Sequence, residues 1–415
     1  MESSTYPAPR RTIMTPGPVE ADPRVLRAMS APVLGQFDPA FTSIMNDVME
    51  MLRKVFRTDN HWAYPIDGTS RSGIEAVLCS IIQPGSKVFI PIFGRFGHLL
   101  MEISERYGAD VYTMECEWGT VFDSQNVILE MKKVQPDIVA AVHGETSTGC
   151  MQPLAEIGKA CRDMDALFVV DAVATIGGTP VYVDEWFIDA AAGGTQKCIS
   201  VPSGMAPITY NSRVEKIINS RKKVERGIAT AADKNHTESP IISNYFDLSQ
   251  LQDYWSPRRL NHHTEATSML YALHEGLRVI LLEGLEKRFS RHIFHERALM
   301  TGIEAMGLDL YVKHEAKLPV VTCVKVPDGI DADAVRRMLL QEFGVEIASS
   351  FGPLHGKIWR IGTMGYSCRK ENVYFVLSSL EAVLSYFDAP IKPGKALQSV
   401  LSYYYETGHD NSIGL

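Results

Sequence analysis

The sequence has few cysteines for its length, and none of them is paired in a motif. Seven cysteines are spread over 415 residues without a CxxC pair. A scattered set that is odd in number argues against a disulfide framework and against a zinc cluster, and it suits a reducing compartment. We therefore expect a cytoplasmic protein without a metal site.

Long apolar runs and an excess of positive charge are also lacking. No stretch approaches the roughly 18 apolar residues of a membrane span, and the N-terminal segment has no apolar core of a signal peptide. Lys and Arg number 41 against 49 Asp and Glu, a net charge of −8. Such a chain binds nucleic acid and anionic membranes poorly, so we expect neither as a partner. A small anionic substrate remains compatible, because a few basic side chains suffice for it.

What the sequence does contain is an alternation of helical and strand patterns up to about residue 210. Short apolar runs over 137–144, 166–173 and 189–197 end in polar or glycine-rich turns, as buried parallel strands do. Segments of helix length separate them, among them 45–56 and 68–82. This alternation predicts a mostly parallel sheet covered by helices.

The pattern changes beyond about residue 213. Charged loops and a long amphipathic helix over 263–285 come first, and a smaller α+β unit follows after about residue 315. We expect a boundary inside helical structure near residues 280–300. The predicted organisation is an N-terminal arm, a large domain and a small C-terminal domain, at 1–20, 21–285 and 286–415.

Two charged residues lie where ligands bind in an open parallel sheet, at the carboxyl ends of strands. Asp171 ends one apolar run and Lys197 ends another. A buried lysine loses its charge easily and becomes a nucleophile toward an aldehyde. A buried aspartate needs a cation, and the pyridinium nitrogen of pyridoxal phosphate (PLP) is one. The alternatives are a solvated surface lysine and an aspartate that binds backbone amides.

Three further positions suit binding of such a cofactor and its substrate. Residues 68–71 (Gly-Thr-Ser-Arg) lead into a helix, where backbone amides, hydroxyls and a guanidinium can hold a phosphate. Phe93 could lie flat on a ring, and Arg360 in an apolar run needs an anion such as a carboxylate. The alternatives are an ordinary helix cap, core packing and a structural salt bridge.

Five segments resemble, in order and spacing, the class V group of fold type I PLP-dependent aminotransferases: TPGPVE, HGETSTG, VDAVATIGG, GGTQK and IWRIGTMG. The alanine–glyoxylate and serine–glyoxylate branch is most similar, and the resemblance covers nearly the whole chain. It implies PLP as the cofactor. It also implies a fold type I α/β architecture, with a large domain on a mostly parallel seven-stranded sheet and a smaller C-terminal α+β domain.

The resemblance further implies a role for individual residues. Lys197 and Asp171 would be the catalytic pair, the first bonded to the cofactor's aldehyde carbon and the second holding its ring nitrogen. Arg360 would bind the substrate carboxylate. Thr264 would act across the interface of a homodimer with shared active sites. The cofactor-binding set would comprise Thr69, Ser70, Arg71, Phe93, Thr146, Asp171, Gln196, Lys197 and Thr264.

Two carboxamide residues bear on the amino donor. Gln36 follows the N-terminal segment, and Asn261 stands where relatives that use alanine or serine commonly have Tyr. Carboxamides offer both donors and acceptors for a ureido group and would discriminate against a methyl group. We therefore expect ping-pong transamination from a ureido-bearing donor to glyoxylate, with alanine or serine as the alternative donor. A purely structural role in loops is the alternative for both residues, and His262 and His263 receive no catalytic role.

Two other functions remain possible on this fold. A desulfurase would need a mobile catalytic cysteine, and no cysteine lies in a suggestive glycine-flanked loop, although Cys368 is close to Arg360 in sequence. A non-catalytic PLP-fold binding protein is the other. The intact Lys197, Asp171 and Arg360 argue against it.

Overall fold

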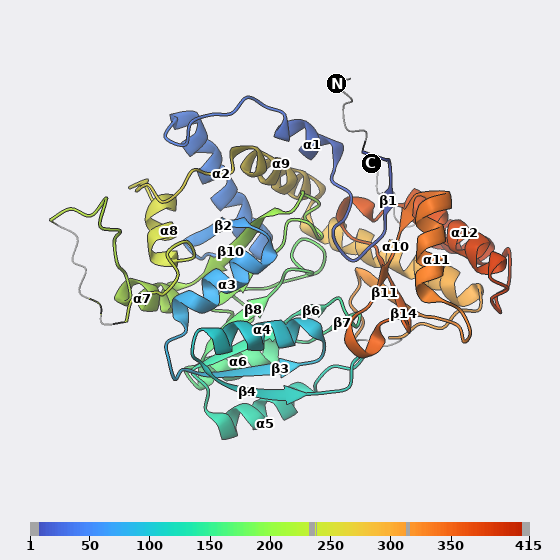
Figure 1. The fold of residues 1–415 in the computed structure, drawn as a ribbon, viewed down its shortest axis with the longest axis horizontal. Helices are drawn as coiled ribbons and strands as arrows, with labels where there is room; N and C mark the ends of the chain where they lie inside the picture. Colours follow the sequence, from blue (N-terminus) through green and yellow to red (C-terminus); the bar gives the residue numbers. More distant parts are fainter. Residues whose placement is uncertain (1–7, 232–236, 238, 313–315, 409–415) are drawn as a thin grey trace, which may run out of the picture.

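A seven-stranded sheet forms the centre of the larger part of the molecule (Figure 1). The computed structural model describes residues 8–231, 237, 239–312 and 316–408. The strand order is β2-β10-β9-β8-β5-β3-β4, and only β10 runs antiparallel to its neighbours. The strands are β2 (Trp62–Gly68), β3 (Lys87–Ile92), β4 (Asp110–Glu115), β5 (Ile138–Val142), β8 (Leu167–Asp171), β9 (Ala190–Ala192) and β10 (Gly204–Tyr210). The prediction of a mostly parallel seven-stranded sheet is confirmed.

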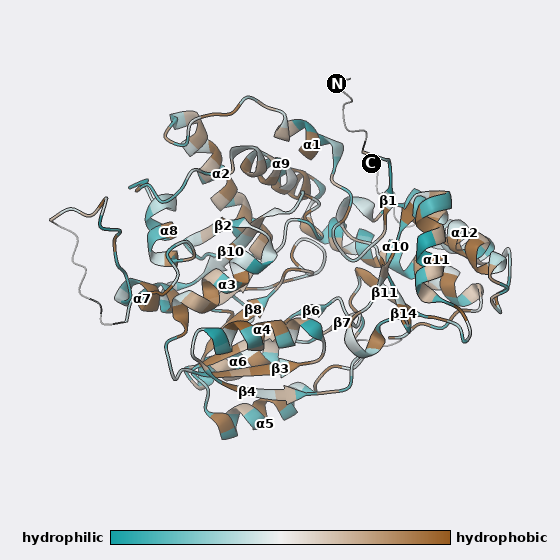
Figure 2. Ribbon diagram, viewed as in Figure 1, coloured by the Kyte–Doolittle hydropathy of each residue, from teal (hydrophilic) through white to brown (hydrophobic). Residues whose placement is uncertain are grey.

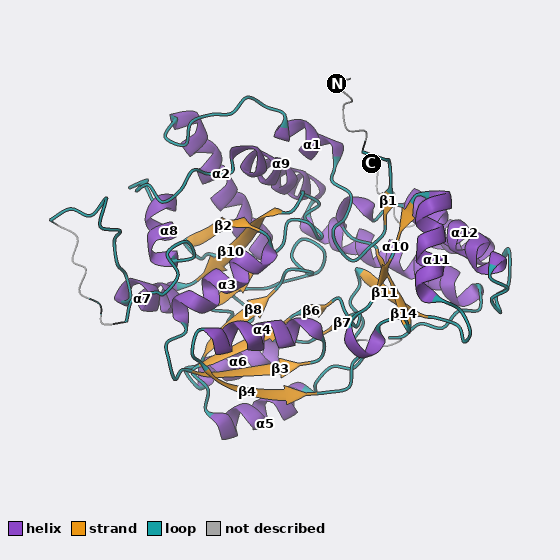
Figure 3. Ribbon diagram, in the orientation of Figure 1, coloured by secondary structure: helices purple, strands orange, loops and turns teal. Residues whose placement is uncertain are grey.

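Helices cover both faces of this sheet (Figure 3). The central strands β5 and β8 are buried along their whole length, which is why they read as continuous apolar runs. Figure 2 shows these hydrophobic stretches in brown. The helices are α1 (Pro23–Met29), α2 (Pro39–Phe56), α3 (Ser70–Ile81), α4 (Arg95–Arg106), α5 (Ser124–Val134), α6 (Ala155–Asp163), α7 (Ser212–Ser220), α8 (Leu248–Trp255) and α9 (Thr267–Glu283).

Two helix boundaries differ from the sequence expectation. Helix α2 begins at Pro39 rather than residue 45, because the Asp38 carboxylate accepts a hydrogen bond from the Ala40 amide at 2.7 Å and proline suits a first helical turn. Helix α9 begins only at Thr267 rather than residue 263, because the Asp67 carboxylate binds the Ala266 amide at 2.9 Å and keeps the preceding residues in a loop.

The smaller part contains two small sheets and four helices (Figure 1). Strands β11 (Val321–Lys325), β14 (Ile358–Gly362) and β13 (Ala348–Ser349) form an antiparallel sheet in that order, and β1 (Thr12–Ile13) of the N-terminal arm pairs in parallel with β12 (Val345–Glu346). The helices are α10 (Leu285–Ala305), α11 (Ala332–Met338), α12 (Lys370–Tyr386) and α13 (Lys395–Gly408). A two-stranded hairpin of β6 (Gly144–Glu145) and β7 (Cys150–Met151) projects from the large sheet.

Apolar packing supports our division into arm, large domain and small domain, which we keep as a proposal. One buried cluster surrounds the seven-stranded sheet, and a second joins Met14 of the arm to the helices and strands after Ala298. Gly284 separates α9 from α10 with a φ of 84° that favours glycine. None of the helices in the described ranges is long and apolar enough to cross a membrane.

Candidate active site

Asp171 and Lys197 are both buried at the carboxyl ends of neighbouring strands: Asp171 is the last residue of β8, and Lys197 lies in the turn after β9. Burial raises the pKa of the Asp171 carboxyl to about 7, and the Val173 amide donates to it at 2.9 Å. Burial, followed by the charge of Arg360, lowers the pKa of the Lys197 amine to about 8. A buried acid and a buried amine with pKa values near neutrality suit proton transfer and covalent chemistry.

The turn that bears Lys197 packs against the N-terminus of α3. A Cβ at Gly194 would lie 2.5 Å from Ser70 Oγ, so the turn needs glycine there. The Gln196 carboxamide lies at 2.8 and 2.9 Å from Ser70 Oγ through its nitrogen and oxygen. Thr69 is the N-cap of α3, and Arg71 is exposed in its first turn. The free amides of this helix end can hold a phosphate.

Phe93 lies between β3 and α4, and its ring is buried. The hairpin β6–β7 fixes the start of α4, because Glu145 Oε2 accepts from the Phe96 amide at 2.8 Å and Ser147 Oγ from the Arg95 amide at 3.1 Å. Sequence reasoning missed Glu145. The segment HGETSTG could have revealed it, because a carboxylate between these glycines has backbone amides and hydroxyls as its hydrogen-bond donors.

Arg360 projects from β14 toward the hairpin loop that contains Thr146. Its Nη1 donates to the Thr146 carbonyl at 3.0 Å and its Nε to the Ser349 carbonyl at 2.7 Å. The guanidinium carbon lies 4.6 Å from the centre of the Phe351 ring. Within the described residues Arg360 forms no ion pair, so the expected alternative of a structural salt bridge is not seen there. The remaining N–H groups can bind a carboxylate.

The N-terminal arm also contacts Lys197, which sequence reasoning did not anticipate. Lys197 Nζ donates to the Pro16 carbonyl. The neighbouring Gly17 has a φ of 105°, and a Cβ there would overlap Lys197 Nζ. The Val19 amide donates to the Gln196 carbonyl at 3.1 Å, and the Gly362 amide to the Met14 carbonyl at 2.7 Å. The segment TPGPVE thus lies between the Lys197 turn and β14.

Gln36 and Asn261 lie together, but in a different neighbourhood. Gln36 Nε2 donates to Asn261 Oδ1 at 2.7 Å, and the Glu265 amide donates to Gln36 Oε1 at 3.4 Å. Asn261 and Thr264 are both exposed. The contacts of this group lead to Asp67 at the end of β2, not to Lys197 of the same chain.

Beneath that group lies a buried acidic cluster that sequence reasoning missed. His263 Nε2 is 3.2 Å from Asp67 Oδ2 and 3.8 Å from Glu265 Oε2, and His263 Nδ1 is 2.8 Å from His262 Nδ1. Burial, then the charge of Asp67, raises the pKa of Glu265 well above its ordinary value. The sequence marked its two histidines but not the cluster, because Asp67 comes from a segment far away in the chain.

The side chains around Lys197 fit PLP as a group. A buried amine suits the aldehyde, and the Asp171 carboxylate is a buried acid for which a pyridinium would supply the missing cation. The hydroxyl of Ser70 and the Gln196 carboxamide lie at a helix N-terminus, as a phosphate requires.

Comparison with known proteins agrees with this chemistry. The model of the family "Aminotransferase class-V" matches residues 26–358. The chain is 69% identical over 407 residues to (S)-ureidoglycine–glyoxylate transaminase of Bacillus subtilis, and the alignment covers 98% of each chain. It is 35% identical over 383 residues to alanine–glyoxylate aminotransferase of Drosophila melanogaster, covering 91% of this chain and 93% of the relative.

Solved structures give the same result. The crystal structure of ureidoglycine–glyoxylate aminotransferase from B. subtilis superimposes with a TM-score of 0.92 and 67% identity, covering 97% of this chain and all of that one. An alanine–glyoxylate aminotransferase from Nostoc gives a TM-score of 0.87 at 36% identity over 92% and 98% of the two chains. The chain therefore belongs to the class V aminotransferases and is a PLP-dependent enzyme of that family.

Proposed function

We propose that this enzyme transfers the amino group of (S)-ureidoglycine to glyoxylate, giving N-carbamoyl-2-oxoglycine (oxalurate) and glycine. The observation that carries the proposal is the 69% identity, over 98% of both chains, to a transaminase named for these substrates. The reaction would belong to purine catabolism, and we place it in the cytoplasm. The seven scattered cysteines, all free, support that compartment.

The paired carboxamides of Gln36 and Asn261 supply a physical reason for the donor. Each side chain offers two N–H donors and one carbonyl acceptor, and a ureido group presents the complementary set. Their mutual hydrogen bond of 2.7 Å already orients them face to face. A methyl group in place of the ureido group would leave these polar atoms unpaired, so alanine would be a poor donor.

Each side chain expected to bind the cofactor or the substrate has a proposed role. Thr69, Ser70, Arg71 and Gln196 would hold the phosphate of PLP, Phe93 would stack on its ring, and Thr146 would bond near the ring's 3-oxygen. Arg360 would bind the carboxylate of each substrate in turn, with its fork oriented by the Ser349 and Thr146 carbonyls. Glyoxylate has no side chain and would need little beyond Arg360.

Proton handling would rest on Lys197 and Asp171. PLP supplies, when bound, an electron sink for the carbanion at the donor's α-carbon. Asp171 would keep a proton on the ring nitrogen by facing it as a carboxylate. Lys197 would take the α-proton of the donor as a general base and then, as a general acid, give a proton to the cofactor carbon in the same half-reaction, and its pKa of about 8 suits both roles. The reverse transfers would serve glyoxylate.

We propose further that two copies of the chain share each site. Thr264 and Asn261 are exposed, and within the described residues neither shares a hydrogen bond with Lys197 of its own chain. Exposed apolar side chains flank them: Val33 is 72% and Phe37 61% exposed, and Tyr245 lies 5.7 Å from the ring of His262. Such a face suits coverage by a second copy, through which Thr264 would reach the partner's phosphate.

The test is the ratio of kcat/KM for ureidoglycine, alanine and serine with glyoxylate as acceptor. We expect ureidoglycine to give the highest value, and a higher value for alanine would reject the donor assignment.

The alanine– or serine–glyoxylate reaction is the second candidate, supported by a relative at 35% identity. Lys197→Ala should abolish turnover with every donor.

A separate variant tests the role of Asn261 in donor specificity. Asn261→Tyr should shift the kcat/KM ratio toward alanine by about tenfold or more, since it removes one ureido-binding carboxamide and adds apolar surface. Asn46→Tyr is a control, because the Asn46 side chain accepts from the Arg259 side chain at 2.6 Å and has no proposed part in binding the donor. An unchanged donor ratio in Asn261→Tyr would contradict the specificity role.

A further inference from the structure

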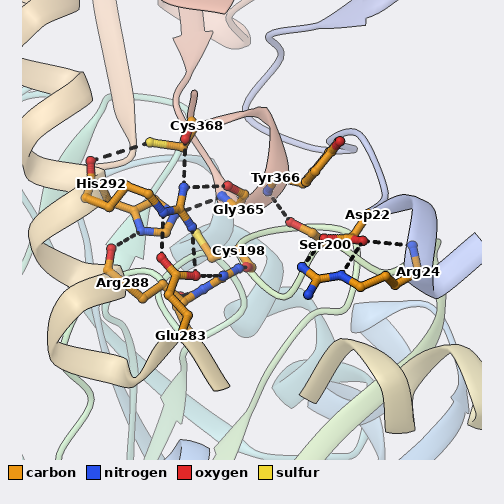
Figure 4. Close-up of polar contacts among 12 residues, drawn as sticks. Asp22, Arg24, Cys198, Ser200, Glu283, Arg288, His292, Gly365, Tyr366 and Cys368 are labelled. Carbon is orange, nitrogen blue, oxygen red and sulfur yellow. Dashed lines mark hydrogen bonds and ion pairs between the residues drawn. The ribbon is translucent and has the colours of Figure 1, made fainter. Parts of the chain in front are cut away.

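Three loops carry the residues that we propose bind PLP and substrate. One follows β8 and Asp171 and contains Gly177; a second contains Lys197 and Cys198; the third follows β14 and Arg360 and contains Gly365. All three meet the junction of α9 and α10, where polar side chains bind their backbones (Figure 4).

Arg288, in the first turns of α10, bonds the first two loops together. Its Nε donates to the Gly177 carbonyl at 2.8 Å, and its Nη2 donates to the Cys198 carbonyl. Its Nη1 donates to Glu283 Oε2 at 2.6 Å. The Arg288 side chain is 4% exposed. One buried guanidinium therefore fixes the backbone beside Asp171 to the backbone beside Lys197.

Arg291, one turn further along α10, holds the third loop. Its Nη1 donates to the Gly365 carbonyl at 3.0 Å and to the Cys368 carbonyl at 2.7 Å, and its Nε donates to Glu283 Oε1 at 2.6 Å. His292 adds to this attachment, because its Nε2 accepts from the Gly365 amide at 2.8 Å. The loop after Arg360 is thus bound through both an amide and two carbonyls.

Glu283, the last residue of α9, joins the two arginines. Its Oε1 accepts from Arg291 and its Oε2 from both Arg288 and Arg291, so a single carboxylate orients both guanidinium groups. The second and third loops also touch directly, since the Tyr366 amide donates to Ser200 Oγ at 2.6 Å (Figure 4). A Cβ at Gly365 would overlap that hydroxyl, which shows how close the two loops are.

We propose that Glu283, Arg288 and Arg291 are positioning residues, which hold the loops of Asp171, Lys197 and Arg360 in one fixed arrangement. The inference rests on the roles proposed above for those three residues. Transamination needs the Lys197 amine and the substrate carboxylate at fixed relative positions. A displacement of either by about 1 Å lowers the rate on the order of 10²-fold. The three residues touch neither cofactor nor substrate, so they act through the backbone.

The decisive variant is Glu283→Gln, which keeps the size of the side chain but removes the charge that orients both arginines. Glu275→Gln is the matched control on the same helix. Glu275 also binds one arginine through both oxygens, Arg278 at 2.7 Å each, but that pair holds no active-site loop. We expect Glu283→Gln to lower kcat/KM by about 10- to 100-fold, and Glu275→Gln to leave it unchanged.

Separate arginine variants give a sharper readout, because lysine keeps the charge but not the planar fork. Arg291→Lys should mainly raise KM for glyoxylate, through the Arg360 loop. Arg288→Lys should mainly lower kcat and shift the pH midpoint of the absorbance band of cofactor bound to Lys197. Equal effects on both parameters in both variants would indicate general destabilisation and overturn the proposal.

Hydrogen exchange of the cofactor-free protein tests the geometry without any activity. Amides in 172–178, 193–201 and 361–369 should exchange faster in Glu283→Gln than in Glu275→Gln. Unchanged exchange in all three segments would refute the positioning role even if activity fell. If exchange rises but the wild type does not transaminate ureidoglycine, the proposed function fails and the positioning role stands.

Discussion

At the scale of single residues, Gly17 of the N-terminal arm is needed for the contact between the arm and Lys197. Its φ of 105° is unfavourable for any residue with a Cβ, and a Cβ there would overlap Lys197 Nζ. We expect Gly17→Ala to lower kcat by tenfold or more, on the order of the cost of displacing a reacting group, and to displace the arm from the Lys197 turn. Steady-state kinetics, together with the absorbance of bound cofactor, measures both effects.

Gly329→Ala is the matched control for this variant. Gly329 also has a positive φ, of 80°, but a Cβ there would have no atom within 4 Å. Its kinetics should equal those of the wild type. A Gly17→Ala enzyme with full activity would show that the arm does not constrain Lys197.

Glu265 should make the stability of the protein depend on pH. Burial, then the charge of Asp67, raises its folded-state pKa well above the ordinary value of 4.5. The folded state therefore favours the protonated carboxyl, and the stability that this gives is present below the unfolded pKa and lost as the pH rises through the folded pKa. Glu265→Gln removes that loss. Its Tm relative to wild type should thus be higher at about pH 8 than at about pH 5.

Glu275→Gln should show the opposite sign. The hydrogen bond from Arg278 lowers the pKa of Glu275, so its contribution is present above the unfolded pKa and lost as the pH falls. The Tm of Glu275→Gln relative to wild type should therefore be lower at the higher pH. The same pH trend in both variants would contradict the assignment of a protonated Glu265.

Whether a site residue could be predicted from the sequence depends on whether its partners are near or far along the chain. Lys197, Asp171 and Arg360 end or interrupt apolar strands, so local pattern alone marked them. Glu145 binds the Phe96 amide and Arg291 binds the Gly365 carbonyl, both in segments far away in the chain, and those partners become neighbours only on folding. The arm's contact with Lys197 spans 181 residues and was hidden for the same reason.

At the scale of elements, the hairpin β6–β7 acts as the cap of α4, which has no side-chain cap of its own. The Glu145 carboxylate accepts three hydrogen bonds: from the Ser147 amide at 2.9 Å, from Ser147 Oγ at 2.6 Å and from the Phe96 amide at 2.8 Å. Because Phe93 directly precedes this helix, the cap also fixes the residue that we propose stacks on the PLP ring.

Glu145→Gln should therefore weaken both the fold and cofactor binding. One oxygen becomes an NH2 group that must face a donor, either the Phe96 amide or the Ser147 amide, and a buried donor is left unpaired. Such a group costs about 1–3 kcal/mol. Chemical unfolding and a PLP titration of the cofactor-free protein measure the two effects.

Asp331→Asn is the control for this cap. Asp331 caps α11 in the C-terminal part, with bonds from the Asp333 and Ala334 amides at 2.9 and 3.0 Å, and it is far along the chain from the PLP-binding residues. Its substitution should leave PLP affinity unchanged. Equal loss of PLP affinity in both variants would argue that the Glu145 cap has no special relation to Phe93.

Elements were predicted best where the local pattern decides them. The runs over 137–144 and 166–173 became β5 and β8 with nearly the expected bounds, because both strands are buried throughout. The run over 189–197 gave a strand of only three residues, since the chain turns at Thr195, whose carbonyl accepts from the Val201 amide at 3.0 Å. The pairing of β1 with β12 could not be predicted, because it joins the two ends of the chain.

At the scale of the whole molecule, we propose that the active site is incomplete in one chain. The buried residues around Lys197 lie in one neighbourhood, whereas Gln36, Asn261 and the exposed Thr264 lie in another with an uncovered apolar rim. In a dimer with a twofold axis, the residues around Lys197 of one chain would face the Gln36, Asn261 and Thr264 group of its partner, and the reverse would hold at the second site. This arrangement predicts that catalysis depends on contributions from two chains.

Mixing two inactive variants tests this directly. Lys197→Ala lacks the amine, and Thr264→Val combined with Asn261→Ala lacks the groups proposed to act across the interface. In a mixed dimer one site combines both defects, while the other is wild type throughout. After unfolding and refolding an equal mixture, half of the dimers would be mixed, so activity should recover to about a quarter of wild type. Each variant refolded alone should stay inactive. If the site were complete within one chain, no mixture could recover activity, because each chain would carry its own defect into its own site.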